Sequence, residues 1–254
     1  MTEPVAADLL PHRTGRCLTA VRPIRITDVD PRGRLRLDAI ARYLQDIAND
    51  DSMDAGFTDE AAMAWVVRRT VIVQLAPGHR RETVTAATWC GGLGRRWADR
   101  RTTLRGDRGQ HIEASSIWVH VDPATGTPAR FPEAFLELYA ESAEGRKVSS
   151  KLVHPTAPDP TTGGITEHRW AIRRTDLDPW NHVNNAATWA IVEEHARPQL
   201  RATGFRAELE YRNALNGPDD ATVTVQSSAD ANRLWINDAA GELVATALVS
   251  VTTP

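Results

Sequence analysis

Six side chains able to donate, accept or exchange protons fall within ten residues of this chain. They are Asp176, Asp178, Asn181, His182, Asn184 and Asn185. Such groups are costly to bury unless each finds a partner. An apolar run with helical spacing follows them. The stretch is therefore either a solvated turn that caps a helix or a site for proton-transfer chemistry.

Asp178 and His182 are the pair best suited to such chemistry. A carboxylate ahead of a helix can position or deprotonate a water molecule. A histidine that titrates near neutrality can hold a carbonyl or water, or orient the carboxylate. The plainer alternatives are a helix cap for Asp178 and a surface histidine in a turn for His182. Glu193 and Glu194 lie too far along the helix to join them, since Glu194 would stand roughly 18 Å from His182.

The elements that must position these groups occur twice. Residues 24–31 read IRITDVDP and residues 172–179 read IRRTDLDP, identical at six of eight positions. An apolar stripe with the 3.6-residue period of a helix packed on one face follows each copy. The first stripe consists of Leu37, Ile40, Ala41, Leu44, Ile47 and Ala48, and the second of Val183, Ala186, Ala187, Ala190 and Ile191.

Four strand-like segments follow each helix, rich in branched and aromatic residues and separated by Gly and Pro turns. A stretch rich in Pro, Gly, Ser and Thr, 146–168, separates the halves and is typical of a linker. We therefore predict an α+β fold with two domains, 1–145 and 169–254. In each, a long helix lies against a curved antiparallel sheet, and a pseudo-twofold axis relates the two.

Composition excludes several classes of protein. Apolar residues make up 41% of the 254 and charged residues 25%, which is ordinary for a globular protein. No run suits a transmembrane helix and the N-terminus lacks a signal-peptide pattern, so we expect a cytoplasmic protein. The net charge of -3 argues against general nucleic-acid binding. Cys17 and Cys90 show no metal-like spacing, and we expect neither metal nor cofactor.

One basic segment stands out against the acidic balance. Residues 94–108 carry six arginines and two aspartates. The segment is either a solvated strand pair or a landing surface for an acidic partner. For the second interpretation we assign Arg95, Arg96, Arg100 and Arg101.

Several motifs together resemble a known family. They are YLQDIANDDSMDAG, WVVRRTVIVQL, ATWCGGLGRRWADRR, ASSIWVHVDPATGTPARFPE, DLDPWNHVNN and ELEYR, and they span about Arg22 to Val251. In this order and spacing they resemble the acyl-acyl-carrier-protein thioesterases, which carry two hotdog domains in one chain. The resemblance implies a tandem double hotdog fold. It also implies hydrolysis of a thioester between a fatty acyl chain and the carrier protein's phosphopantetheine arm.

The resemblance further implies a division of labour between the halves. The second domain holds the catalytic motif and the first holds the acyl tunnel. Where the second copy has Asn181, His182 and Asn184, the first has Gly33, Arg34 and Arg36. We therefore place the chemistry in the second copy, with Asp178, Asn181 and His182 as candidate catalytic residues. Asp176 matches Asp28 of the first copy and is expected to be structural.

A helix start offers unpaired amides and the positive end of its dipole. If the second helix begins near His182, the amides of Val183 and Asn184 could stabilise an oxyanion. The side chains of Asn184 and Asn185 are expected to tie down the loop. In a pseudo-dimer the opposing helix could add Asn49 or Asp50. Plausible tunnel or core residues are Phe57, Trp65, Trp89 and Trp118.

The chain departs from the plant-type pattern at three positions. The family asparagine two residues after the aspartate is Trp180 here, and the family glutamate and cysteine after LEYR are Ala214 and Leu215. Three interpretations stay open: a thioesterase acting on carrier-protein thioesters, the same chemistry on acyl-coenzyme A, and a non-catalytic binder of acyl thioesters. Either a monomer or a homodimer suits the pattern.

Overall fold

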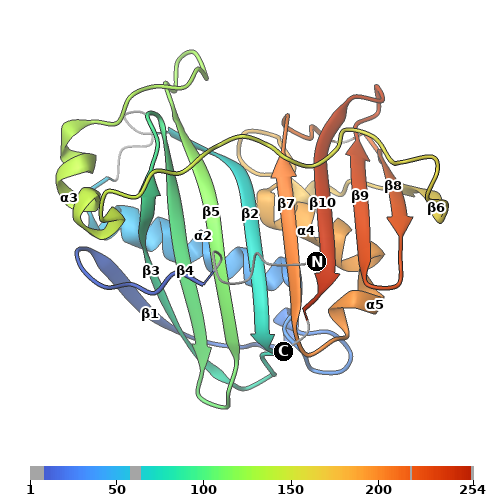
Figure 1. Cartoon of the computed structure of the whole chain (residues 1–254), viewed down its shortest axis with the longest axis horizontal. Helices are drawn as coiled ribbons and strands as arrows, with labels where there is room; N and C mark the ends of the chain where they lie inside the picture. The colour runs from blue at the N-terminus through green and yellow to red at the C-terminus, as the bar shows by residue number, and fades with distance from the viewer. Residues whose placement is uncertain (1–8, 58–63, 218, 253–254) are drawn as a thin grey trace.

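The computed structural model describes residues 9–57, 64–217 and 219–252, which form one ten-stranded sheet with helices on one of its faces (Figure 1). The strands of the first half are β1 (Cys17–Pro23), β2 (Ala64–Ala76), β3 (Thr83–Leu93), β4 (Trp97–Gly106) and β5 (His111–Val121). Those of the second half are β6 (Ile165–Trp170), β7 (Phe205–Tyr211), β8 (Ala221–Ser227), β9 (Ala231–Asn237) and β10 (Leu243–Val251).

Two main helices, α2 (Leu37–Asp54) and α4 (Asn185–His195), lie side by side on the concave face. A 3-10 turn precedes each one, η1 (Ile26–Asp28) and η2 (Arg174–Asp176). The helix α3 (Glu133–Ala143) packs at the β3 side of the sheet, and the short α5 (Arg197–Leu200) follows α4. In the described part of the chain, no helix is both long and apolar enough to cross a lipid bilayer.

The sheet order shows the predicted pseudo-twofold relation. From edge to edge it runs β1-β3-β4-β5-β2-β7-β10-β9-β8-β6, and every neighbouring pair is antiparallel. Each strand of the first half therefore has its counterpart at the mirrored place in the second. The halves join where β2 pairs with β7, with Thr70 opposite Leu209 and Ile72 opposite Ala207. The expected α+β double hotdog is confirmed.

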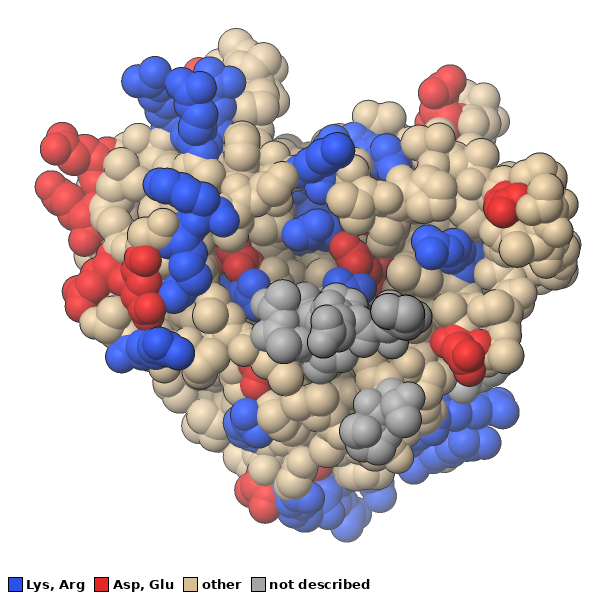
Figure 2. Space-filling model, viewed as in Figure 1, with Lys and Arg blue, Asp and Glu red and all other residues tan. Residues whose placement is uncertain are grey.

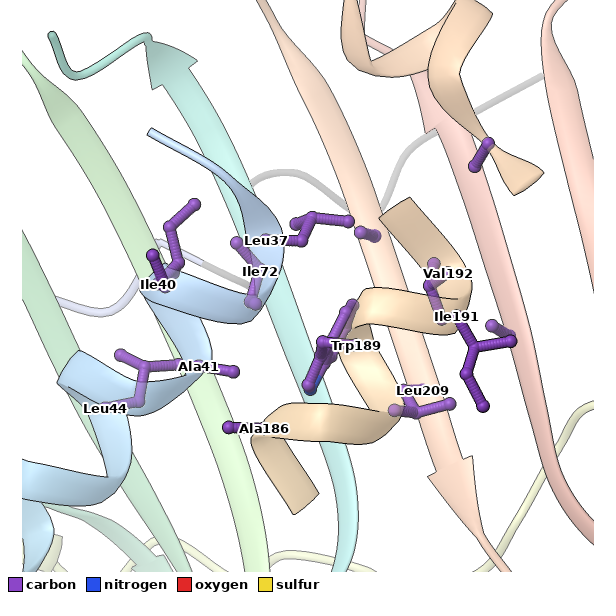
Figure 3. Close-up of a cluster of buried hydrophobic side chains, with 14 of the residues drawn as sticks. Leu37, Ile40, Ala41, Leu44, Ile72, Ala186, Trp189, Ile191, Val192 and Leu209 are labelled. Carbon is purple, nitrogen blue, oxygen red and sulfur yellow. The ribbon is translucent and has the colours of Figure 1, made fainter. Parts of the chain in front are cut away.

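The main core fills the space between this sheet and the two helices (Figure 3). The predicted helical stripes supply it, because Leu37, Ile40 and Ile191 are almost fully buried. Trp189 of α4 projects between the helices, and Ala41, at the corresponding place on α2, leaves room for it. A large side chain that faces a small one gives the close packing that protein cores require.

The predicted linker, 146–168, crosses the outer face of the sheet as an extended segment (Figure 1). Its last four residues belong to β6, so the irregular part ends at Gly164. We keep the division into domains at this segment as a proposal. Helix α3, which covers the β3 side of the first half, was not among the elements predicted from the sequence.

A buried cluster of ionisable groups holds the linker against the sheet. Glu210 of β7 accepts hydrogen bonds from the amides of Val153 and His154, at 2.6 and 3.1 Å. The His154 ring faces Glu208, with Nε2 3.7 Å from Oε2. Both glutamates and His154 have the spacing of metal ligands. However, Arg206 contacts Glu208 at 2.6 Å, and the backbone amides occupy Glu210, so these carboxylates already have cationic and N–H partners.

Candidate active site

The loop that carries Asp178 is braced by the Asp178 carboxylate itself. Its Oδ1 accepts hydrogen bonds from the amides of Trp180 and His182, at 2.9 and 3.0 Å. In the first half, Oδ1 of Asp30 accepts from two amides spaced in the same way, at 2.8 and 2.9 Å. Bracing the loop is therefore a role that both aspartates share. The other oxygen of the Asp178 carboxylate, Oδ2, makes no hydrogen bond with any of the residues that the structure describes.

Asn181 has a backbone role in this loop. Its φ is 65°, in the left-handed region that asparagine and glycine tolerate best, and the matching residue of the first half, Gly33, has a φ of 78°. The side chains of Asn181 and His182 are exposed, and neither lines the cavity described below. The structure therefore does not bring them to Asp178 as a catalytic group, and their proposed roles remain predictions from the sequence.

The oxyanion assignment to Val183 and Asn184 needs correction. The Val183 amide donates to the Leu215 carbonyl at 2.7 Å, and the Asn184 amide donates to the Asp176 carbonyl at 2.8 Å. The helix begins at Asn185, three residues later than expected, because residues 177 and 183 form a β-bridge that extends the loop. Both amides are thus committed to the loop and cannot bind a substrate oxygen.

The first helical amide, that of Asn185, replaces them as the candidate donor. Asn184 is the N-cap, and its Oδ1 accepts from the Ala186 amide at 2.8 Å. The side chain of Asn184 thus ties down the loop as predicted. Across the described residues, the Asn185 amide has no recorded acceptor, as the first turn of a helix leads one to expect.

The other half shows what such an amide can hold. Leu37, the first residue of α2, corresponds to Asn185, and its amide donates to Oε2 of Glu193 at 2.8 Å. By the same correspondence Gln45 of α2 takes the place of Glu193. Gln45 and Asn185 line the same cavity. The start of α2 is thus closed by a carboxylate, whereas the start of α4 faces a neutral side chain and open space.

That cavity has a volume of about 610 Å³, within the usual range for small-molecule sites. Asp178, Asn184 and Asn185 line it at the start of α4. From there it extends into the first half, where its wall consists of Trp65, Cys90, Ala98, Trp118, Phe135 and Tyr139. One space therefore joins the loop carboxylate and the helix start to an aromatic-lined compartment.

The opposing helix also lines the cavity, and a catalytic part for its residues remains a prediction. Asn49 and Asp50 of α2 both line it. Asp50 is paired with Arg22, another lining residue, so its charge is already balanced. Trp180, which replaces the family asparagine, also lines it and is 66% exposed, which places this indole at the mouth.

The predicted aromatic lining is confirmed in part. Trp65 and Trp118 line the cavity, whereas Trp89 does not. Phe57 lies behind the wall and stacks on Tyr139. Cys90 is a lining residue whose burial raises the pKa of the thiol to about 11, so it is a poor nucleophile at neutral pH.

Two of the four arginines assigned to a partner surface point elsewhere. Arg100 pairs with the buried Asp51 at 2.8 Å and lines the cavity, and Arg101 pairs with the buried Asp99 at 2.6 Å. Alternation along the strand cannot reveal the pairing of Arg100, because Asp51 lies on α2, whereas Asp99 precedes Arg101 by two residues on β4 itself. Arg95 and Arg96 are exposed at the β3–β4 turn. Figure 2 shows Lys and Arg gathered at its upper left, where that end of the sheet lies.

Sequence reasoning missed Gln45, Arg100 and Tyr139 as cavity residues. The internal repeat could have revealed Gln45, because aligning the halves sets it against Glu193. Tyr139 belongs to α3, a helix that was not predicted from the sequence. Arg100 was assigned to the surface together with neighbouring arginines, several of which are exposed.

Comparison with known proteins agrees with this geometry. Residues 19–139 match the family model of the acyl-ACP thioesterase N-terminal domain. An uncharacterized protein of Mycobacterium tuberculosis is 33% identical over 210 residues, which cover 82% of each chain. The chain belongs to the acyl-ACP thioesterase family. The activity of this family is the hydrolysis of acyl thioesters.

Solved structures of acyl-ACP thioesterases share the fold over nearly the whole chain. A protein from Lactobacillus plantarum, provisionally identified as an oleoyl thioesterase, gives a TM-score of 0.79 at 20% identity and covers 94% of this chain and 98% of its own. The 12:0-ACP thioesterase from Umbellularia californica gives 0.74 at 20% identity, with the same coverage. An acyl-ACP thioesterase from Bacteroides thetaiotaomicron gives 0.74 at 20% identity and covers 92% and 97%.

Proposed function

We propose that the protein hydrolyses fatty acyl thioesters carried on acyl carrier protein and releases the free fatty acid. One observation carries the proposal: a single cavity joins the Asp178 carboxylate, the first turn of α4 and an aromatic-lined compartment. A thioester bound there has its carbonyl near a helix start, a base beside it, and room for its chain.

The Asn185 amide is the donor for the carbonyl oxygen. A donor of this kind aimed at the developing oxyanion contributes about 3 kcal/mol of transition-state stabilisation in other enzymes. The contact between Leu37 and Glu193 supports the assignment, since an equivalent helix start already binds an anionic oxygen at 2.8 Å. The positive end of the α4 dipole adds to the attraction.

Asp178 acts on the water. Because its Oδ1 is held by two amides, its Oδ2 has a fixed direction and is the atom that accepts the water's proton. The water oxygen bonds to the carbonyl carbon and gives a tetrahedral oxyanion at Asn185. Collapse breaks the carbon–sulfur bond, and the departing thiolate recovers the proton from Asp178. Water and thioester thus give a carboxylic acid and a thiol.

The family positions Ala214 and Leu215 take no part in this scheme. Leu215 is buried and its carbonyl accepts the Val183 amide, so it positions the loop through its backbone. The carboxylate that the plant-type motif would add there is absent. Asp178 is therefore the base in this proposal.

Panels of acyl-carrier-protein and acyl-coenzyme A thioesters test the function. The protein is incubated with chains of several lengths, and released thiol is measured. Release from carrier-protein substrates at higher kcat/KM supports the proposal. Faster release from coenzyme A thioesters would make acyl-coenzyme A the substrate. Tight binding of acyl thioesters without any release would identify a non-catalytic binder and contradict it.

A further inference from the structure

The concave face of the sheet is polar around Arg100, which lines the cavity. Thr70 of β2 and Ser116 of β5 share a hydrogen bond of 3.0 Å, and Thr102 of β4 donates to Thr88 of β3 at 3.1 Å. All four are buried. Farther along the same strands the face is apolar, with Leu104 and other core residues. We call these four residues and Arg100 the polar belt.

Arg100 is the only charged member of this belt and has donors to spare. One terminal nitrogen, Nη1, donates to Oδ2 of Asp51 at 2.8 Å and to Oγ1 of Thr88 at 3.4 Å. Neither Nε nor Nη2 of Arg100 donates a hydrogen bond to a residue in the described parts of the chain. The side chain keeps 17% of its surface exposed and lines the cavity. Unused guanidinium donors therefore face the substrate space.

The charge of Arg100 is balanced behind the belt, but its hydrogen-bond donors are not all used. Asp51 is completely buried and pairs with both Arg16 and Arg100. The hydroxyl of Tyr139 also donates to it, at 2.8 Å. Arg16 also pairs with Asp54 at 2.6 Å, so two carboxylates serve the two guanidinium groups. Covering Arg100 with plain hydrocarbon would remove water from its open donors and return no hydrogen bond.

A small cavity of about 30 Å³ connects the belt to the start of α4. Arg100, Thr70, Thr102 and Ser116 line one side, and Gln45, Asn185 and Ala186 line the other. The space suits one or two oxygen-sized groups. It adjoins the amide that the proposed function assigns to the thioester carbonyl. An oxygen atom held there belongs to a carbon close to that carbonyl.

We propose that the polar belt selects acyl chains that carry an oxygen at the third carbon, as in 3-hydroxyacyl and 3-oxoacyl thioesters. The inference rests on the proposed hydrolysis and adds its substrate class. The substituent accepts a hydrogen bond from Arg100, and a hydroxyl can also donate to Thr102 or Ser116. The rest of the chain continues into the aromatic compartment. An unsubstituted chain leaves the Nε and Nη2 donors of Arg100 without an acceptor and is the poorer substrate.

The test compares unsubstituted, 3-oxo and both enantiomeric 3-hydroxy thioesters of equal length and on the same carrier. Wild-type kcat/KM should be at least about tenfold higher for an oxygenated chain, because sites that bind a substrate hydroxyl discriminate against its absence. Arg100→Lys keeps a charge beside Asp51 but loses the guanidinium donors, and Thr102→Val removes a hydroxyl at constant shape. Each should lower that ratio several-fold. Arg105→Lys, an exposed change on the same strand, should leave it unchanged.

Other results would overturn the inference in distinguishable ways. Equal or faster hydrolysis of the unsubstituted chain would refute the selection and leave the proposed function intact. Equal losses on both substrates in Arg100→Lys and Thr102→Val would show that the belt serves the fold or the carbonyl. Thermal melts of the variants separate those two. Hydrolysis of none of the thioesters would refute the proposed function and this inference with it.

Discussion

The carboxylate of Glu193, on α4, accepts a hydrogen bond from the backbone amide of Leu37, the first residue of α2, with Oε2 2.8 Å from the nitrogen. The pseudo-twofold axis turns this pair into Gln45 and Asn185. The same fold is thus closed at one helix start and open at the other. In the proposed function, Gln45 in place of a glutamate leaves the start of α4 open to a substrate oxygen.

Replacing Gln45 by Glu should close the second site as the first is closed. The new carboxylate would compete for the Asn185 amide and repel the developing oxyanion. We expect kcat to fall by about 10²-fold, the effect of losing one oxyanion donor. Thiol release at neutral pH is the measurement. Full activity in this variant would show that Asn185 does not bind the carbonyl.

The reverse change, Glu193→Gln, is the matched control. It keeps an acceptor oxygen for the Leu37 amide in the half without chemistry, so kcat/KM should stay within about threefold of wild type. A loss as large as that of Gln45→Glu would point to a general effect on the packing of α2 against α4.

Substitutions at Asn181 can distinguish a role in backbone conformation from a role in catalysis. With φ at 65°, Asn181→Gly should retain stability and activity, whereas Asn181→Ala should lower the free energy of unfolding by about 1 kcal/mol. Denaturant unfolding and thiol release on both variants provide the comparison. Equal, large losses of kcat in the two would restore the catalytic role predicted from the sequence.

The exposed arginines at the β3–β4 turn test the choice of carrier. Arg95→Ser combined with Arg96→Ser should raise KM for an acyl-carrier-protein substrate by about tenfold at low salt, with a smaller effect at high salt, because surface charges steer an acidic partner. Arg105→Ser, at the other end of β4, is the control. An unchanged KM in the double variant would remove the carrier protein from this surface.

The lowered pKa of Glu208 predicts how the stability of the fold changes in acid. Burial raises the pKa of this carboxyl. The neighbouring His154 ring and the Arg206 guanidinium lower the pKa by a larger amount, so that it falls to about 2. Because the folded pKa lies below the ordinary 4.5, the carboxylate stabilises the fold above pH 4.5, and that contribution is lost as the pH falls towards 2. The stability gap between wild type and Glu208→Gln should shrink by about 3 kcal/mol across this window. A constant gap in denaturant melts would contradict the assignment.

Local patterns were enough to predict the architecture. The repeat around Asp28 and Asp176, the helical stripes and the alternating strands gave the two halves and their relation. The buried positions Leu37 and Ile191 followed from helical period alone. Helix α3 was not predicted. Its apolar positions, such as Phe135 and Tyr139, complete a cluster with residues of β2, β3 and β4 that are distant in the sequence.

The loop before α4 stays the proposed site, but the structure changes which of its atoms are open to a substrate. The sequence indicates the loop before α4, yet it does not reveal that a β-bridge delays the helix to Asn185 and commits the Val183 amide. Asn181 was chosen for its polar side chain, and the sequence did not show that its backbone takes a φ of 65°. Arg100 looked like surface charge because its partner, Asp51, lies on another element. The errors over Val183 and Arg100 arise from contacts with residues far away in the sequence, which spacing does not encode.

The most direct test compares Asp178→Asn with Asp30→Asn. Each substituted side chain keeps an oxygen that can accept the two loop amides, so both variants should fold, as thermal melts will check. The account predicts that Asp178→Asn lowers kcat/KM for thioester hydrolysis by at least about 10²-fold, the contribution of a general base, and that Asp30→Asn changes it by less than about threefold. Comparable activity in the two variants would contradict the account, because the carboxylate at Asp178 would then serve the loop alone.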